Sequence, residues 1–355
     1  MQINYYPSNG VNTYTGYGKM ELGVARGLQA AGVTLNIAPV EGVPTLVCGN
    51  AGWLEAPHVR GHRLWLMTMS EADRISDDWV WLINHTAERV LVPAPGLVQI
   101  YRDSGVDVPV HYVGLGVDDF EKPAPNPHPL TPSPQSNEGE QDVFTLLTYS
   151  YGDMRKGADL AMLAFNRLFK DDARYRMVVK AREGHDKTWL AGLEDEQITV
   201  IGGATDEAAW RNLLLSADCF VFPSRGEGFG LPPREAALMG LPVIATEWLG
   251  MWDVAQWGLP IRVKDMRPSR FDKWEANAEG SRWSEPDDGH LQMQMKWVVE
   301  HPAEARAIAR RGREYLLKTA NWDVVAGRIV SLLVEHEQRD REHVQTLTKV
   351  LGVKA

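Results

Sequence analysis

Cysteine is almost absent from this 355-residue chain, which holds only Cys48 and Cys219. Each lies in an apolar run, and two thiols so far apart form neither a disulfide scaffold nor a metal cluster. We therefore expect both thiols to be buried and reduced. No apolar run reaches 18 residues, so no membrane-spanning helix is predicted. The first residues show neither a basic nor a hydrophobic stretch, which argues against a signal peptide and favours the cytoplasm.

Positive charge is also scarce, because 37 Lys and Arg stand against 47 Asp and Glu, a formal net charge of −10. Proteins that coat nucleic acids or anionic membranes usually have basic surfaces, so neither is expected as the main task. Hydrophobic residues make up 44% of the chain and charged residues 24%, which is ordinary for a globular protein with a sizeable core. The 13 Trp residues fit packing in that core better than a broad site for flat ligands.

A proline-rich segment divides the chain, whose length favours about two domains. Residues 121–141 contain six prolines, a density that excludes a helix or a central strand and predicts an extended linker. We expect an N-terminal domain at residues 1–120, a C-terminal domain at residues 142–320 and C-terminal helices at residues 321–355.

Short apolar strands alternate with helices on both sides of this segment. Before it, strands are expected near residues 1–6, 33–38, 45–48, 64–69, 89–92 and 110–113, with helices near 18–31, 78–87 and 95–104. After it, strands are expected near residues 143–149, 175–180, 198–201, 219–223 and 242–246, with helices near 158–169, 206–216 and 232–239. This alternation predicts parallel sheets covered by helices on both faces. The expected fold class is α/β, with two doubly wound, Rossmann-like domains and a cleft between them.

The most informative stretch is a glycine-rich loop, Gly226–Gly230, which follows the strand that ends at Pro223. It lies at the carboxyl edge of the predicted sheet, where open α/β sheets bind ligands. Pro232 and Pro233 fit the first turn of the next helix, where a missing N–H costs nothing. The free amides from Gly228 to Leu231 then lie at the positive end of a helix dipole, which suits a phosphate.

Two glutamates accompany this loop, Glu227 within it and Glu235 in the expected first helical turn. A carboxylate beside a phosphate site would repel the phosphate. Each glutamate is therefore expected to bind something else, such as the hydroxyl groups of a sugar or a ribose. The alternative is a structural turn in which Glu235 merely compensates the helix dipole.

This stretch resembles the donor-site signature of the retaining GT-B glycosyltransferases, a family that includes bacterial mannosyl- and glucosyltransferases. The resemblance rests on Glu227-Gly-Phe-Gly-Leu, on the second glutamate eight positions on, and on Gly240-Leu-Pro-Val-Ile-Ala-Thr. Further similar segments are Val113–Asp118, Arg155–Asp159, Val200–Ala204, Leu213–Val221 and Asn321-Trp322. The resemblance covers about residues 89–335. It implies a GT4-like enzyme with a GT-B fold, whose last helix crosses back to the first domain.

The resemblance also implies roles for individual residues. Glu227 would bind the hydroxyl groups of the donor sugar, Glu235 the nucleotide ribose, and Lys156 the diphosphate. Fixed cations and amides stabilise a departing diphosphate in place of a metal ion. The expected donor is a UDP- or GDP-sugar, and neither a metal nor another cofactor is expected. The backbone N–H groups that would hold the sugar and the phosphate belong to Gly228, Phe229, Gly230 and Leu231.

Two positions depart from the family's pattern. The family often has an arginine before the Lys-Gly step, and here either Arg155 supplies that charge or it is simply solvated. The family also often has a histidine after an N-terminal strand, near the reacting carbon, and none is present here. Glu71 either acts on the acceptor side with Asp73, as a base or a hydroxyl anchor, or belongs to a helix start capped by Ser70.

The loop before the first expected helix contains Gly16, Tyr17 and Gly18 but no Gly-x-Gly-x-x-Gly fingerprint. Dinucleotide binding is therefore weakly supported. In GT-B enzymes the equivalent loop faces the cleft, so the resemblance implies that Gly16 and Tyr17 contact the donor. The alternative is a flexible turn.

The sequence thus favours a metal-independent, retaining hexosyltransferase. The alternatives are a nucleotide-sugar epimerase or phosphorylase on the same fold, or a non-catalytic subunit that binds nucleotide sugars. The acceptor stays open between a glycan, a lipid-linked sugar, a small molecule and a modified nucleobase, and so does the oligomeric state. A lipid acceptor is disfavoured because the first 60 residues contain only three cations, Lys19, Arg26 and Arg60.

Overall fold

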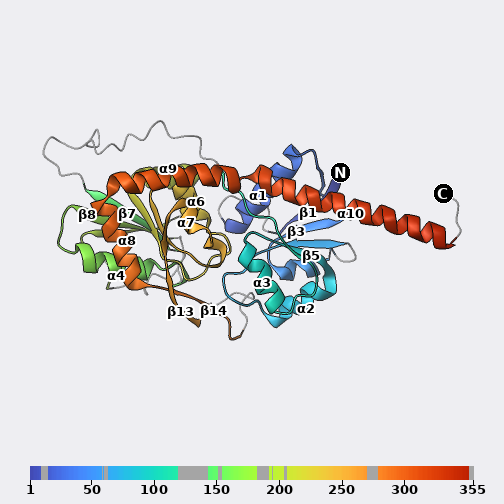
Figure 1. The fold of residues 1–355 in the computed structure, drawn as a ribbon, viewed down its shortest axis with the longest axis horizontal. Coiled ribbons are helices and arrows are strands. Elements are labelled where there is room, and N and C mark those ends of the chain that lie inside the picture. The colour runs from blue at the N-terminus through green and yellow to red at the C-terminus, as the bar shows by residue number, and fades with distance from the viewer. Residues whose placement is uncertain are drawn as a thin grey trace.

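The computed structural model describes residues 1–8, 15–57, 59, 63–118, 143–150, 154–181, 192–193, 195–203, 206–269 and 279–351, without the side chains of 347–351. They form two α/β domains that lie next to each other. Two consecutive long helices lie along them, one on each domain (Figure 1). The predicted linker at residues 121–141 lies outside the described residues. The predicted fold class, two doubly wound Rossmann-like domains, is confirmed.

The N-terminal domain is built around a six-stranded parallel sheet in the order β2-β1-β3-β4-β5-β6. Its central strands are wholly buried and continuously apolar, because helices cover both faces of a parallel sheet. The strands are β1 (Gln2–Pro7), β2 (Thr34–Asn36), β3 (Thr45–Cys48), β4 (Leu64–Met67), β5 (Ala87–Val92) and β6 (Val110–Tyr112). The helices are α1 (Gly16–Ala30), η1 (Ala51–Glu55), α2 (Asp77–Thr86) and α3 (Pro95–Asp103).

The C-terminal domain has its own six-stranded parallel sheet, in the order β12-β11-β10-β7-β8-β9. Its strands are β7 (Phe144–Ser150), β8 (Tyr175–Ala181), β9 (Ile198–Ile201), β10 (Cys219–Phe222), β11 (Val243–Thr246) and β12 (Leu259–Ile261). Its helices are η2 (Met154–Lys156), α4 (Ala158–Phe169), α5 (Glu207–Leu215), α6 (Leu231–Leu238), η4 (Leu249–Met251), α7 (Val254–Trp257) and α8 (Asp288–Glu300). The strand order changes direction between β7 and β10, and such a switch point is where open α/β sheets bind ligands.

A two-stranded antiparallel hairpin, β13 (Val263–Pro268) and β14 (Arg282–Pro286), extends from the C-terminal domain. It reaches toward the N-terminal domain in Figure 1. The sequence did not predict it, because Val-Lys-Asp-Met-Arg-Pro is half polar and mostly exposed, so no apolar alternation marks the strand.

The last two helices join the domains. α9 (Pro302–Thr319) packs on α6 and α7 of the C-terminal domain, and α10 (Trp322–Leu351) packs on α1 of the N-terminal domain. A Cβ atom on Gly23 would lie 2.0 Å from the ring of Trp322, so the close approach of α1 and α10 requires glycine there. The crossing of the last helix to the first domain is thereby confirmed.

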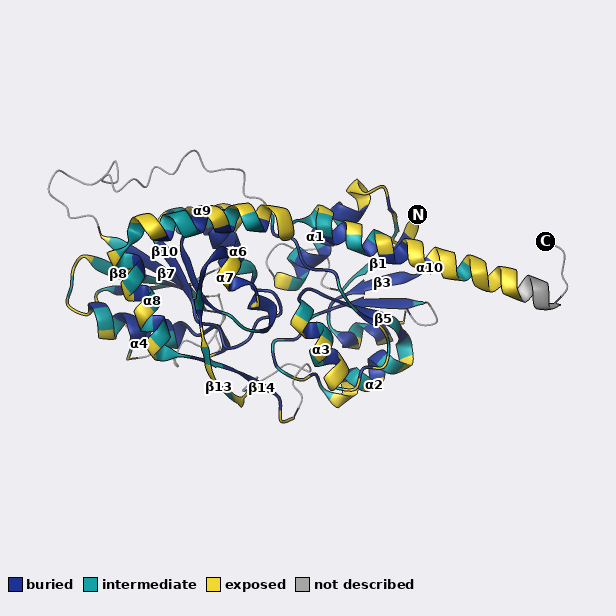
Figure 2. Ribbon diagram, viewed as in Figure 1, coloured by how far each residue is buried: buried dark blue, intermediate teal, exposed yellow. Residues whose placement is uncertain are grey.

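The central strands of both sheets are buried, and residues 341–346 of α10 are exposed (Figure 2). Cys48 and Cys219 are free and fully buried, as predicted, and burial raises the pKa of both thiols. None of the described helices combines the length and the apolar character that crossing a bilayer requires.

Candidate functional site

The loops that leave β7 and β10 meet at the switch point of the C-terminal sheet. η2 follows β7 and carries Arg155 and Lys156, and the glycine-rich loop follows β10. The backbone N–H of Arg225 donates to the carbonyl of Arg155 at 2.6 Å, which ties the two loops together. The topology therefore places the two segments that the sequence singled out beside each other.

The glycine-rich loop leads into α6 as predicted. Gly230 caps the helix with a left-handed φ of 79°, and a Cβ atom there would lie 2.1 Å from the sulfur of Met251. The first turn of α6 contains no acidic residue. Within the described part of the chain, no protein acceptor pairs with the backbone N–H groups of Gly228, Phe229, Gly230 and Leu231. These amides are available to an anion at the positive end of α6.

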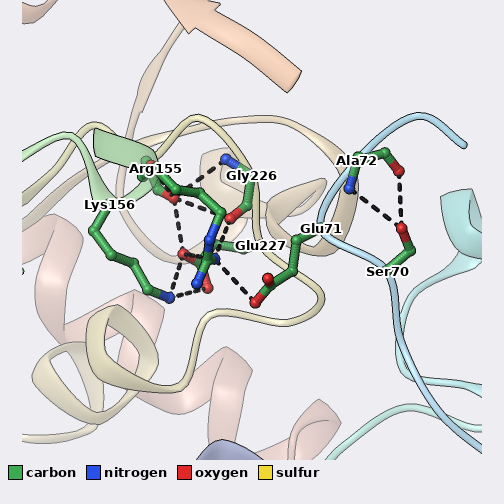
Figure 3. Close-up of polar contacts among 8 residues, drawn as sticks. Ser70, Glu71, Ala72, Arg155, Lys156, Gly226 and Glu227 are labelled. Atoms are coloured by element: carbon green, nitrogen blue, oxygen red, sulfur yellow. Dashed lines mark hydrogen bonds and ion pairs between the residues drawn. The ribbon is translucent and has the colours of Figure 1, made fainter. Parts of the chain in front are cut away.

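Glu227 lies at the centre of a buried charge cluster (Figure 3). Its carboxylate accepts from the ammonium of Lys156 at 2.6 and 2.9 Å and from the hydroxyl of Ser224 at 2.8 Å. Arg155 reaches the same carboxylate at 3.3 Å. The Glu227 and Lys156 side chains are only 5% and 9% exposed, so their charges are little screened by water.

Arg155 is buried, so its interpretation as a solvated cation is wrong. Its guanidinium donates to the carbonyl of Gly226 at 2.7 Å and pairs with Glu71 of the N-terminal domain at 2.9 Å. Figure 3 shows Glu71 facing this guanidinium across the boundary between the domains. The Glu71 side chain stays 36% exposed, whereas Arg155 is 6% exposed.

The segment of the N-terminal domain around Glu71 packs directly on the glycine-rich loop. A Cβ atom on Gly226 would lie 2.0 Å from the carbonyl oxygen of Glu71, and one on Gly228 would lie 2.6 Å from Met69. Glycine is therefore required at these two positions for a steric reason. Any larger residue would push the two domains apart at the site.

The alternative interpretation of Ser70 as a helix cap is wrong. α2 begins at Asp77 and is capped by Ser76, whose hydroxyl accepts from the backbone N–H of Trp79 at 3.2 Å. Ser70 instead forms a local turn with Ala72 (Figure 3).

Asp73 joins the N-terminal domain to β14. Its carboxylate accepts from the backbone N–H of Arg282 at 2.6 Å and from the guanidinium of the same residue at 2.9 Å. The backbone N–H of Asp73 donates to the Arg282 carbonyl at 2.9 Å. Both carboxylate oxygens are thus engaged by the hairpin, and a role of Asp73 toward an acceptor stays a prediction.

The prediction that Glu235 lies in the first turn of α6 is wrong. Glu235 is the fifth residue of the helix. Its carboxylate accepts from the indole N–H of Trp210 at 2.7 Å and pairs with the ammonium of Lys19, from α1 of the other domain. These partners, rather than the helix dipole, account for the buried charge.

Gly16 and Tyr17 open α1, which is capped by Thr15 and has no acidic residue in its first turn. The Tyr17 hydroxyl lies near Thr68 and Met69, and burial raises its pKa to about 12. Gly16 is exposed, with open space where a Cβ atom would stand. Contact of either residue with a donor stays a prediction.

Three cations near the site were not singled out from the sequence. Lys19 pairs with Glu235, and Arg225 pairs with Asp159 and Glu285. Arg234 donates to the carbonyls of Phe229 and Gly250 and pairs with Asp253. The only signal was that arginines stand inside a glycine-rich motif, and their partners lie too far along the chain to be identified from it.

The arrangement suits an anionic ligand with hydroxyl groups. Lys19, Arg155 and Lys156 supply positive charge, and the amides that open α6 add donors to it. Among the described side chains, no group of three or more His, Cys, Asp or Glu is placed to hold a metal ion. The expectation of a metal-independent reaction stays a prediction.

Comparisons with known proteins found relatives of this chain in sequence and in structure. The family model GT4-conflict, described as "Family 4 Glycosyltransferase in conflict systems", matches residues 102–329. The lipopolysaccharide core biosynthesis mannosyltransferase LpsB of Rhizobium meliloti (strain 1021) is 47% identical over 57 residues, which are 16% of this chain and 15% of that protein.

Solved structures share the fold at low identity. A TarM variant of S. aureus, solved with UDP and alpha-GlcNAc-glycerol, has a TM-score of 0.58 at 12% identity and covers 82% of this chain. This chain spans about half of TarM, 55% of its length. Sucrose-phosphate synthase from Thermosynechococcus elongatus has a TM-score of 0.60 at 17% identity, over 84% of this chain and 74% of that one. A UDP-forming trehalose-phosphate synthase from Burkholderia xenovorans has a TM-score of 0.60 at 11% identity, and the match covers 88% of this chain and 77% of that one.

Proposed function

Because the chain belongs to the family 4 glycosyltransferases of conflict systems and has the GT-B fold, we propose that it moves a hexose from a nucleoside-diphosphate donor to an acceptor with retention. The observation that carries the proposal is the buried Lys156–Glu227 pair beside the free amides of α6. A cation and a carboxylate held together at a helix start match a donor with a charged diphosphate and a hydroxyl-rich sugar.

In the proposed reaction, the bond between the anomeric carbon and the diphosphate oxygen breaks, and the bonding electrons leave with the nucleoside diphosphate. Lys156, Arg155 and the amides from Gly228 to Leu231 stabilise the charge that develops on the leaving group. Glu227 binds hydroxyl groups of the sugar, and Glu235 binds the ribose. Retention rests on the family resemblance.

Glu71 is proposed to act on the acceptor side. Its carboxylate is the most exposed of the charged groups around Arg155, and it comes from the opposite domain. It is therefore placed to meet an acceptor hydroxyl that enters between the domains, as a base or an anchor. UDP is the first donor nucleotide to test, because TarM was solved with UDP and the trehalose-phosphate synthase is UDP-forming.

A thermal-shift panel of UDP-, GDP-, ADP- and dTDP-sugars tests the proposal, because a bound donor stabilises the folded protein by mass action. We expect one nucleotide class to raise the melting temperature, and Glu227→Gln to abolish the rise that depends on the sugar. Glu314→Gln, on the exposed side of α9, is the matched control. Release of nucleoside diphosphate with and without candidate acceptors then separates a transferase from an epimerase. Absence of any shift across the panel contradicts the proposal.

A further inference from the structure

Lys19 crosses the boundary between the two domains. It is the fourth residue of α1, and its ammonium pairs with the Glu235 carboxylate on α6 of the C-terminal domain. The Lys19 side chain is 24% exposed and the Glu235 side chain 5% exposed, so the pair lies at the edge of the interface with the carboxylate buried. The contact therefore depends on the two domains lying against each other.

Glu235 takes its other hydrogen bond from a neutral donor, the indole N–H of Trp210. Among the described residues, Lys19 is the cation that pairs with this carboxylate. A buried carboxylate without a cation is costly, so Lys19 supplies the opposite charge that Glu235 needs from the other domain.

The first turn of α1 adds to this charge. Thr15 caps the helix by accepting from the backbone N–H of Gly18 at 2.9 Å, and no acidic residue stands in that turn. An ammonium has three donors, and the carboxylate of Glu235 uses one of them. Lys19 thus has hydrogen-bond donors to spare, and it lies at the positive end of α1, on the N-terminal domain's side of the boundary.

We propose that Lys19 is a donor-positioning residue that couples nucleotide binding to the approach of the two domains. This rests on the proposed function, in which Glu235 binds the ribose. With Lys19 on one of its oxygens, Glu235 keeps lone pairs for ribose hydroxyls. The remaining ammonium donors face the phosphates. A nucleotide that contacts both residues holds the N-terminal domain against the C-terminal one, and the approach of the domains strengthens nucleotide binding in return.

The test compares UDP and GDP binding by calorimetry in the full chain and in three variants. Lys19→Met removes the charge and keeps the stem, whereas Lys19→Arg keeps a cation. Arg26→Met removes an exposed cation two turns further along α1 and is the control. We expect Lys19→Met to weaken nucleotide binding by about tenfold, Lys19→Arg to recover most of the loss, and Arg26→Met to bind like the wild type.

Small-angle scattering with saturating nucleotide supplies a readout that a merely structural role does not move. We expect nucleotide to hold the wild type in the compact arrangement described here, with Lys19 on Glu235, and to leave Lys19→Met less compact than the wild type. Binding of Lys19→Met within twofold of the wild type, or tighter, overturns the inference, and so does equal compaction. Failure of the wild type to bind UDP, GDP, ADP or dTDP overturns the proposed function itself, so the two failures are distinct.

Discussion

Glu227 is the most densely paired carboxylate of the site, with Lys156, Arg155 and Ser224 around it. These partners hold its carboxylate in place at the loop that the sequence associates with a donor sugar. Such a cluster serves binding better than stability, because a buried ion pair gains little net stability over well-packed apolar groups. Its presence at the switch point is therefore best explained by the ligand it receives.

Replacing Lys156 by Met tests this at the level of one side chain. Sugar transfer, or slow donor hydrolysis, is expected to fall by about 10²–10³-fold, because a fixed cation on the leaving group is lost. Lys318→Met, on the exposed face of α9, is the control and should leave the rate unchanged. A Lys156→Met enzyme with more than half of the wild-type rate contradicts the assigned role.

Asp253 gives a pH-dependent prediction. Burial raises the pKa of Asp253, but the facing guanidinium of Arg234 outweighs this effect and holds the pKa below its usual range. The pair therefore contributes stability above the unfolded-state pKa, about 3.9, and loses it as the pH falls through the lowered folded-state pKa. Asp253→Asn should cost about 3 kcal/mol of unfolding free energy at neutral pH, and this difference should shrink below about pH 4. Urea titrations at several pH values measure it, and an equal difference at pH 3 and pH 7 contradicts it.

The residues of the site divide by how they could be recognised. Glu227 and Glu235 belong to a local pattern of glycines and glutamates, and Lys156 belongs to a Lys-Gly step, so the sequence named all three as candidates. Lys19 and Arg234 pair with residues that only the folded chain brings close, so no local sequence pattern indicates these pairs. The expected start of α6 was also late by one residue, which moves Glu235 out of the first turn, because helix starts are uncertain by a residue or two.

At the scale of elements, α1 and α10 show how a helix pair fixes its own separation. Gly23 faces the ring of Trp322, whereas Gly327, on the exposed side of α10, has no atom within 4 Å of a Cβ position. Gly23→Ala is expected to lower the unfolding free energy by about 1–3 kcal/mol through overpacking. Gly327→Ala is expected to raise it by about 0.5–1 kcal/mol, because a helical glycine is entropically costly.

Chemical denaturation of the two alanine variants measures whether their unfolding free energies change in opposite directions. Equal effects in both would mean that α10 does not approach α1 as closely as described. Loss of stability in Gly327→Ala alone would place the packed face of α10 on its other side.

Most helices and strands were predictable because their apolar residues recur at the spacing typical of a helix or a strand. The expected helix at 158–169 and the expected strand at 198–201 match α4 and β9 residue for residue. The hairpin β13–β14 was missed for the opposite reason. β13 is mostly exposed, and β14 mixes the buried Trp283 and Ser284 with charged residues, so neither strand shows an alternation of apolar and polar residues.

At the scale of the whole molecule, ion pairs between described residues join the two domains around the site. They are Arg155 with Glu71, Glu235 with Lys19, and Arg282 with Asp73. Each joins an oppositely charged pair across the boundary, which the sequence alone did not reveal because the partners are far apart along the chain.

The Asp73–Arg282 contact is testable by hydrogen exchange. Asp73→Ala removes the two hydrogen bonds that the Asp73 carboxylate accepts from Arg282 of the hairpin. Amide exchange of residues 280–285 and 70–75 is expected to speed up, with the central strands β3 and β4 unchanged. Asp77→Ala, an exposed acid paired with Arg74, is the control. Unchanged exchange in both segments would show that the hairpin does not hold the domains together.

A crystal structure with UDP tests the central claim most directly, because it locates the diphosphate. The account predicts phosphate oxygens within hydrogen-bonding distance of the Lys156 ammonium and of the amides that open α6. UDP bound at another place, with Lys156 still on Glu227 and no phosphate at the start of α6, would contradict it.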